Sequence, residues 1–246
     1  MHDGLVHHRS GRERHTSDQG CRCDKTPLGS STGATRARDS WAHAECGTGV
    51  CSVWEKQDKP DGACSAAIRL VGPGGAGKST VGALLAERLS VAFVDLDRCF
   101  ADHFGDVGAF IERFGYGAYA RENVETYRAL PAEHASGAVV ALSSGFMTYD
   151  PGVHPDYARI RGELHSCSRT FVLLPFLERE RCVAETIRRQ VARPFGRSPD
   201  REEAVIRARF EIYMGLPMPK IETMRPASEV VDEIIAVLWL LPPSAL

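Results

Sequence analysis

The chain has 246 residues, of which 43% are hydrophobic and 25% are charged, and its formal net charge is −2. This nearly balanced charge gives no reason to expect nucleic acid or an anionic membrane surface as a partner. The longest apolar run, Ile234 to Leu241, is far shorter than the ~20 residues of a membrane-spanning helix, and no apolar segment near the N-terminus resembles a signal peptide. We therefore expect a cytoplasmic protein that acts without a membrane.

Residues 1–65 differ in composition from the rest of the chain. They contain only six Leu, Ile, Val, Phe or Met residues, which are too few to cover a hydrophobic core, so we expect a disordered extension or the product of an early start codon. Zinc binding is an open alternative, because cysteine and histidine gather here, but their spacing does not match paired C-x-x-C ligands. A disulfide framework is less expected without a secretory signal. The residues concerned are Cys21, Cys23, His43, Cys46, Cys51 and Cys64.

A regular pattern begins at residue 66, and its first part is a glycine-rich loop between a strand and a helix. The apolar run Ala67 to Val71 predicts a buried strand, and Thr80 to Leu89 has the apolar spacing of an amphipathic helix. Between them, Gly72 to Ser79 matches G-x-x-x-x-G-K-[ST], the phosphate-binding loop. A strand, glycine loop and helix in this order direct backbone N–H groups and a helix N-terminus at one anion.

This loop predicts that the protein binds a nucleoside triphosphate with Mg²⁺. The glycines would let the backbone approach phosphate oxygens without interference from Cβ atoms. Lys78 would reach the β- and γ-phosphates, and the Ser79 hydroxyl would bind Mg²⁺. The expected nucleotide-binding residues of the loop are Gly72, Gly74, Gly75, Ala76, Gly77, Lys78, Ser79 and Thr80.

A pair of aspartates follows the second predicted strand, Val91 to Val94. Because residues two apart in an extended chain point to the same side, we expect the carboxylates of Asp95 and Asp97 to lie together. One could hold Mg²⁺, and the other could orient a substrate hydroxyl or accept its proton during phosphoryl transfer. A solvated turn is the alternative interpretation of this pair.

The remaining pattern alternates strands and helices. We expect a helical region at about 110–130, strands at Val139 to Leu142 and Thr170 to Leu174, a basic helical region at about 178–213, a short strand at Lys220 to Thr223, and a helix from about Ala227 to Leu240 that begins after Pro226. Such alternation predicts an α/β fold, a three-layer sandwich around a five-stranded parallel sheet, with ligands at the carboxyl ends of the strands. Residues 66–246 are expected to form one domain.

The basic region could supply cations to a migrating phosphoryl group from a mobile lid. For Arg197, Arg201 and Arg207 we prefer the alternative of a solvated, charged helix face. Arg193 and Arg209 stand out only through a resemblance to a known family.

From about Ala67 to Leu240 the chain resembles the shikimate kinases. The phosphate-binding loop is common to many kinases, whereas the ordered set of later motifs is more specific. In that set the two aspartates are followed by Gly115 and Tyr119 (G-x-x-x-[FY]), Arg193-Pro194, Arg209 and Tyr213 (R-x-x-x-Y), and Ile221-Glu222-Thr223 with Arg225-Pro226. The resemblance implies a nucleoside monophosphate kinase-like fold and transfer of the γ-phosphate of ATP to the 3-hydroxyl of shikimate.

The resemblance also implies roles for individual residues. Asp95 would assist Ser79 in binding Mg²⁺, and Asp97 would bind and activate the substrate hydroxyl. Arg193 would be the catalytic lid arginine on the phosphates, together with Lys78. Arg209 would bind the substrate carboxylate through a bidentate contact. The other implied contacts are Arg225 and Pro226 beside the adenine, and Arg121, Ser144 and Gly145 at the substrate.

The acceptor side departs from the family pattern in three places. Three consecutive glycines of the family are here Ser143-Ser144-Gly145, whose hydroxymethyl groups we expect to narrow or reshape the substrate pocket. The family arginine after the aromatic residue is Ala120, and Arg121 lies one position later, about 100° around a helix. The family glutamate after Gly115 is Tyr116.

The sequence is compatible with three functions. The first is phosphorylation of shikimate by a monomeric kinase that uses ATP and Mg²⁺. The second is a related kinase for another small polyol, sugar acid or antibiotic hydroxyl. The third is a regulatory nucleotide-binding protein without catalysis, which Lys78, Asp97 and Arg193 argue against.

Overall fold

The computed structural model describes residues 67–131, 134, 137–191 and 199–240, and all of these belong to one compact unit of the chain. The cysteine-containing segment 1–65 and the predicted lid arginine, Arg193, lie outside the described residues. The predicted division into an extension and a domain from residue 66 stays a prediction.

In the described part of the chain, five short strands form one parallel sheet in the order β2-β3-β1-β4-β5. Leu70 of the central strand pairs with Ala141 on one side and Phe171 on the other. Because the strands are parallel, their carboxyl ends meet at one edge of the sheet, and the loops that carry the predicted site residues gather there. The strands are β1 (Ile68–Val71), β2 (Phe93–Asp95), β3 (Val139–Ala141), β4 (Thr170–Leu174) and β5 (Lys220–Glu222).

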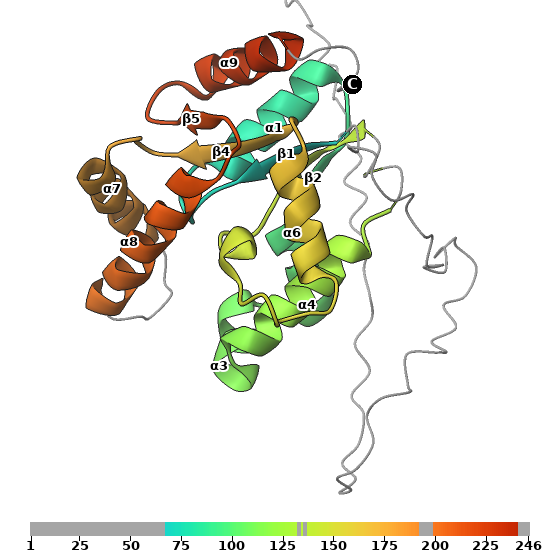
Figure 1. Ribbon diagram of the computed structural model, residues 1–246, viewed down its shortest axis with the longest axis vertical. Helices are drawn as coiled ribbons and strands as arrows, with labels where there is room; N and C mark the ends of the chain where they lie inside the picture. Colours follow the sequence, from blue (N-terminus) through green and yellow to red (C-terminus); the bar gives the residue numbers. More distant parts are fainter. Residues whose placement is uncertain (1–66, 132–133, 135–136, 192–198, 241–246) are drawn as a thin grey trace, which may run out of the picture. The chain divides into compact units, whose positions relative to one another are not determined.

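Helices cover both faces of this sheet, which confirms the predicted α/β fold. Ile68 and Leu70 of β1 point to the face covered by α1 (Lys78–Leu89) and α9 (Ala227–Leu240). Val71 points to the other face, where it joins a second core cluster with side chains of α2 (Leu96–Phe104), α4 (Tyr116–Arg128), α6 (Tyr157–Ser166) and α8 (Pro199–Gly215). Figure 1 shows α1 beside α9 on one face and α4 with α6 on the other. Of the helices in the described ranges, none combines the length and apolarity needed to cross a bilayer.

Helix α2 is a difference from the predicted elements. It begins directly after β2 because the Asp95 carboxylate accepts hydrogen bonds from the backbone N–H groups of Asp97 and Arg98, at 3.0 and 3.3 Å. The cap turns the chain from strand into helix within one residue. Helix α6 was also not predicted, whereas the predicted region at 110–130 contains α3 (Val107–Phe114) and α4.

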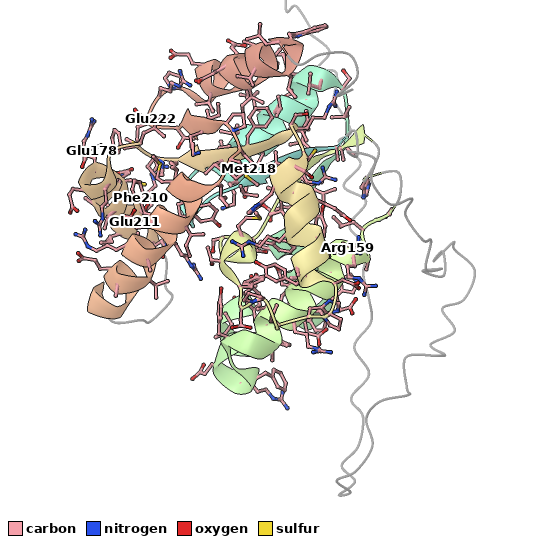
Figure 2. All side chains as sticks on the ribbon, in the orientation of Figure 1. Arg159, Glu178, Phe210, Glu211, Met218 and Glu222 are labelled. Carbon is pink, nitrogen blue, oxygen red and sulfur yellow. The ribbon has the colours of Figure 1, made fainter. Side chains whose placement is uncertain are left out.

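Helices α7 (Arg179–Val191) and α8 pack side by side and are joined by ion pairs. Arg207 makes two hydrogen bonds to the carboxylate of Glu180, at 2.8 and 2.9 Å. Arg179 lies 3.3 Å from Glu211, which is labelled in Figure 2 beside the buried Phe210 of the same helix. The charged face expected for Arg207 therefore forms a helix–helix contact, although exposed ion pairs of this kind stabilise a fold only weakly.

One ion pair predicts a dependence of stability on pH. Partial burial raises the pKa of Glu125, but the hydrogen bond with His154 at 2.7 Å and the charge of Arg128 outweigh it, so that the pKa lies below its usual value. A carboxylate whose pKa is lowered by folding stabilises the fold at pH values above its pKa in the unfolded chain. This stabilisation is lost as the pH falls through the lowered pKa. We expect Glu125→Gln to lower the Tm at pH 7, and we expect the difference in Tm from the wild type to become smaller below about pH 4.5. Thermal melts of both proteins at a series of pH values would measure this difference. A difference in Tm that does not change with pH would contradict the prediction.

Candidate active site

Glycine shapes the loop between β1 and α1. Gly72, Gly75 and Gly77 have φ angles of 147°, 79° and 87°, in the region that residues with a side chain rarely adopt. Lys78 begins α1 and is buried, and its Nζ donates to the carbonyl oxygens of Gly72 and Pro73 at 2.9 Å each. The loop thus holds a cation at a helix N-terminus, an arrangement that suits a bound phosphate.

Ser79 and Asp95 lie together at the edge of this loop. The Ser79 hydroxyl donates to Asp95 Oδ2 at 2.5 Å, and the other carboxylate oxygen caps α2. A hydroxyl and a carboxylate in contact beside a phosphate site are oxygen ligands of the kind that Mg²⁺ binds, with phosphate oxygens and water as its other ligands. The residues present therefore fit the predicted metal site.

Helix α7 supports the glycine loop from the other side. Arg189 donates to the carbonyl oxygen of Gly75 at 2.6 Å and approaches the sulfur of Met224 at 2.7 Å, and Gln190 donates to the carbonyl oxygen of Gly74 at 3.3 Å. Arg189 thereby connects the loop to the segment that precedes α9. Neither of these α7 residues could be predicted as a site residue from the sequence, because nothing in the basic pattern distinguishes Arg189 from its neighbours.

A carboxylate orients Arg189 and permits a matched comparison. Glu185 accepts from Arg188 and from Arg189, at 2.6 to 2.7 Å, and its hydrogen bond with Arg188 contributes most to lowering the pKa of Glu185 to about 2. We expect Arg189→Met to raise the KM for ATP by about 10-fold, since it removes a charge-assisted hydrogen bond to the loop. Arg188→Met, which removes only the exposed partner, is expected to leave that KM within twofold. Equal effects of the two variants in steady-state assays would contradict a specific role of Arg189.

Asp97 lies in the first turn of α2 and is exposed, so the expectation that both aspartates share one side of an extended chain is wrong. Its carboxylate is brought to the site by the helix, and its Oδ1 accepts a hydrogen bond from the hydroxyl of Tyr119 at 3.2 Å. Burial and the charge of Asp97 raise the pKa of Tyr119, which keeps this phenol protonated and able to donate. The backbone of Asp97 also contacts Asp95, and this contact places Asp97 beside the predicted Mg²⁺ ligands.

The loop after β3 contains the substituted glycine positions. Ser143 is 1% exposed, and its hydroxyl accepts a hydrogen bond from the Asn123 amide at 2.9 Å. The Ser143 side chain therefore does not narrow an open pocket, because the protein interior holds it. The expectation that the two serines reshape the substrate pocket stays a prediction. Ser144 is partly exposed, and the hydroxyl of Tyr213 fixes its carbonyl oxygen at 2.8 Å.

Arg209 of α8 lies at the other end of the site. Its Nη2 donates to the hydroxyl of Tyr116 at 2.8 Å, and its guanidinium carbon is 5.9 Å from the centre of that ring. The Tyr116 and Tyr119 rings are 5.8 Å apart, so aromatic side chains connect the arginine to Asp97. A Cβ atom at Gly145 would lie 2.2 Å from the Tyr116 hydroxyl and 3.2 Å from Arg209 Nη2, so a side chain at this position would displace the Tyr116 side chain.

The other predicted site residues have separate positions. Arg121 is exposed on α4, whereas Ala120, at the position of the family arginine, is buried, and no contact joins Arg121 to the residues above. Arg225 pairs with Glu233 and donates to the carbonyl oxygen of Glu222, just before α9. Pro226 is exposed next to it. The structure thus brings the loop, the aspartates, Ser144, Gly145 and Arg209 to one edge of the sheet and leaves Arg121 apart.

Comparison with known proteins gives a consistent result. The sequence profile of the family described as shikimate kinase matches residues 74–239. Shikimate kinase 2 of Salmonella dublin is 30% identical over 179 residues, which cover 72% of this chain and 92% of that protein. The pentafunctional AROM polypeptide of Schizosaccharomyces pombe is 34% identical over 104 residues, but these are 42% of this chain and only 7% of that polypeptide.

Solved structures agree with this similarity. Shikimate kinase from Acinetobacter baumannii, solved in complex with shikimate, is 25% identical and superposes with a TM-score of 0.55, covering 71% of this chain and 93% of that one. Shikimate kinase from Aquifex aeolicus is 24% identical with a TM-score of 0.53, covering 70% of this chain and 96% of that one, and supports the fold.

Proposed function

This chain belongs to the shikimate kinase family, and we propose that it transfers the γ-phosphate of ATP to the 3-hydroxyl of shikimate. One observation carries the proposal: a continuous set of contacts runs from the glycine loop through Ser79, Asp95 and Asp97 to Arg209. A phosphate site, a carboxylate for the acceptor hydroxyl and a cation for the acceptor carboxylate are the parts that this reaction requires.

The donor side of the site is formed by the glycine loop. The backbone N–H groups of Gly74 to Gly77 and the ammonium of Lys78 would bind the β- and γ-phosphates, and Arg225 and Pro226 would lie beside the adenine. Ser79 and Asp95 would hold Mg²⁺, which neutralises charge on the phosphates when it is bound. Arg193, outside the described residues, is proposed as a further cation on the transferred phosphoryl group.

The acceptor side is formed by α2, α4 and α8. Asp97 would orient the attacking hydroxyl and accept its proton, and Arg209 would bind the carboxylate of the acid. Ser144 and Gly145 would line the substrate between these two groups. Arg121, exposed on α4, remains a candidate substrate contact through the family resemblance alone.

ADP release by the full chain with Mg·ATP, with and without shikimate, tests this function. We expect strong dependence of ADP release on shikimate. ATP binding without any stimulation by shikimate would overturn the assignment of the acceptor while leaving the nucleotide site intact.

A specific observation favours a second candidate acceptor. Ala120 is buried in the core, so the described part of α4 offers no cation at the position where the family has an arginine. Another small hydroxylated acid, held by Arg209 alone, would suit this arrangement. If shikimate fails, a panel of sugar acids and cyclic polyols in the same assay would separate the two candidates.

We also propose that the enzyme works as a cytoplasmic monomer without nucleic acid. The nearly balanced net charge supports the absence of a nucleic-acid partner. Light scattering of the purified chain during size-exclusion chromatography would test the oligomeric state.

A further inference from the structure

Four buried polar side chains lie in the core next to Asp97, which the first of them contacts, and we call them the Asp97 network: Tyr119, Asn123, Ser143 and Tyr149. Their exposed fractions are 5%, 0%, 1% and 4%. Two of them are on α4, one follows β3 and one follows the short 3₁₀ helix Phe146–Thr148. Buried polar groups are costly unless their hydrogen bonds are satisfied, so a cluster of this kind in a hydrophobic core calls for a reason.

The hydrogen bonds of the network run in one direction. Tyr149 donates its hydroxyl to Asn123 Oδ1 at 2.9 Å, and Asn123 Nδ2 donates to the Ser143 hydroxyl at 2.9 Å. The hydroxyls of Ser143 and Tyr149 are close enough to the Tyr119 hydroxyl to lower its pKa, against the larger raising effect of burial, and the rings of Tyr119 and Tyr149 meet edge to face with their centres 6.4 Å apart. Because the Ser143 oxygen already accepts from Asn123, its own proton can go to Tyr119, which in turn donates to Asp97 at 3.2 Å.

Because the network ends at Asp97, it can limit the orientation of this exposed carboxylate. Asp97 is exposed, and an exposed aspartate in the first turn of a helix can adopt several rotamers. The Tyr119 phenol is anchored in the core and reaches one of the carboxylate oxygens. Burial and neighbouring charge raise the pKa values of Tyr119 and Tyr149, so both remain hydrogen-bond donors over the working range of pH.

We propose that Asn123, Ser143 and Tyr149 are positioning residues that act through the Tyr119 hydroxyl to hold the Asp97 carboxylate in one orientation toward the acceptor. The proposal rests on the proposed function, because it takes Asp97 as the group that meets the acceptor hydroxyl. It gives Ser143 a role that a glycine at the same position could not fill. In this proposal the hydroxyls of Ser143 and Tyr119 are both needed to hold the Asp97 carboxylate.

Removing the Tyr119 hydroxyl tests the last step of the network. Tyr119→Phe is expected to lower kcat for shikimate by about 10-fold, the order of effect of one hydrogen bond to a charged group, with the KM for ATP unchanged. Tyr127→Phe is the matched control, since Tyr127 is a buried tyrosine of the same helix whose hydroxyl accepts from Arg69 at 3.0 Å. That control is expected to lower the Tm and to keep kcat. If Tyr119→Phe lowers the Tm but leaves kcat unchanged, the proposal is overturned.

A double-mutant cycle tests whether Ser143 acts through Tyr119. Ser143→Ala is expected to lower kcat several-fold on its own, whereas Ser143→Thr, which keeps the hydroxyl, restores most of it. In the Tyr119→Phe background, Ser143→Ala is expected to add little, because residues that act as one unit are not additive. Full additivity would show that Ser143 acts by another route and would overturn the proposal.

A structural measurement separates failure of this inference from failure of the proposed function. If the wild type does not phosphorylate shikimate, the function fails, and crystal structures of the wild type and Ser143→Ala still decide the inference. We expect one Asp97 rotamer in contact with Tyr119 in the wild type and more than one in the variant. A single, unchanged rotamer in both would overturn the network whatever the acceptor is.

Discussion

Replacing Asp97 by asparagine is expected to lower kcat for shikimate phosphorylation by ~10² or more, the range typical of a lost general base. The KM for ATP is expected to change little. Asparagine keeps the shape of the side chain and an oxygen that can accept the hydrogen bond of Tyr119, found at 3.2 Å from Asp97. The substitution therefore removes the charge and the basicity of the group while it preserves the geometry around it. Stopped assays of shikimate-dependent ADP release measure the effect.

The control for this variant is another aspartate on the same helix. Asp102 is exposed on α2, five residues along the chain from Asp97 and outside the contacts that join the site. Asp102→Asn changes the net charge by the same amount, and we expect its kcat to stay within twofold of the wild type. If Asp97→Asn turns over at the wild-type rate, the role of Asp97 as a base is wrong, and orientation by Arg209 alone would have to account for the acceptor.

The sheet and the glycine loop could be predicted because both depend on local sequence. Buried parallel strands appear as short apolar runs, and Thr170 to Leu174 agrees with β4 at both ends. The loop between β1 and α1 needs glycine at defined positions, which the positive φ angles of Gly72, Gly75 and Gly77 explain. The order of the strands had no local signal, since it depends on which faces the helices cover.

The site was less predictable where its contacts join distant segments. Arg189 meets Gly75 across 114 positions in the chain, and Tyr213 meets Ser144 across 69. No spacing rule connects such pairs, and the pattern around Arg189 is that of any charged helix. A signal existed for α2, because an aspartate after a strand is a common helix N-cap. The prediction of an extended chain holds for Asp95, the last residue of β2, and fails for Asp97, which lies in the first turn of α2 after that cap.

The acceptor side shows how a substitution can be misread without its neighbours. A serine in place of a glycine suggests a smaller substrate pocket, but the pocket becomes smaller only if the serine side chain faces the ligand. Ser143 faces Asn123 instead, and both are buried. The compensating residue, Asn123, lies on α4, whereas Ser143 lies in the loop after β3, so the two positions become meaningful only as a pair.

Replacing Gly72 by alanine is expected to abolish measurable ATP binding and to lower the free energy of unfolding by about 3 kcal/mol or more. Two independent features of this position lead to the same result. The φ angle of 147° is strained for any residue with a side chain. A Cβ atom would also lie 2.2 Å from the carbonyl oxygen of Leu173, which belongs to the backbone of β4 and therefore has little freedom to move.

Gly74→Ala in the same loop separates a local clash from a general intolerance of alanine. Gly74 does not have a positive φ, and a Cβ atom there would meet the far end of the Gln190 side chain, 2.7 Å from Nε2. That side chain can rotate away at the loss of its hydrogen bond to the Gly74 carbonyl, so we expect a moderate rise in the KM for ATP and a nearly unchanged Tm. Calorimetric titration with Mg·ATP and thermal melts of both variants would measure these effects. If Gly72→Ala binds ATP as the wild type does, β4 can move away from the loop. The close packing of β4 against Gly72 would then not be required for the shape of the phosphate site.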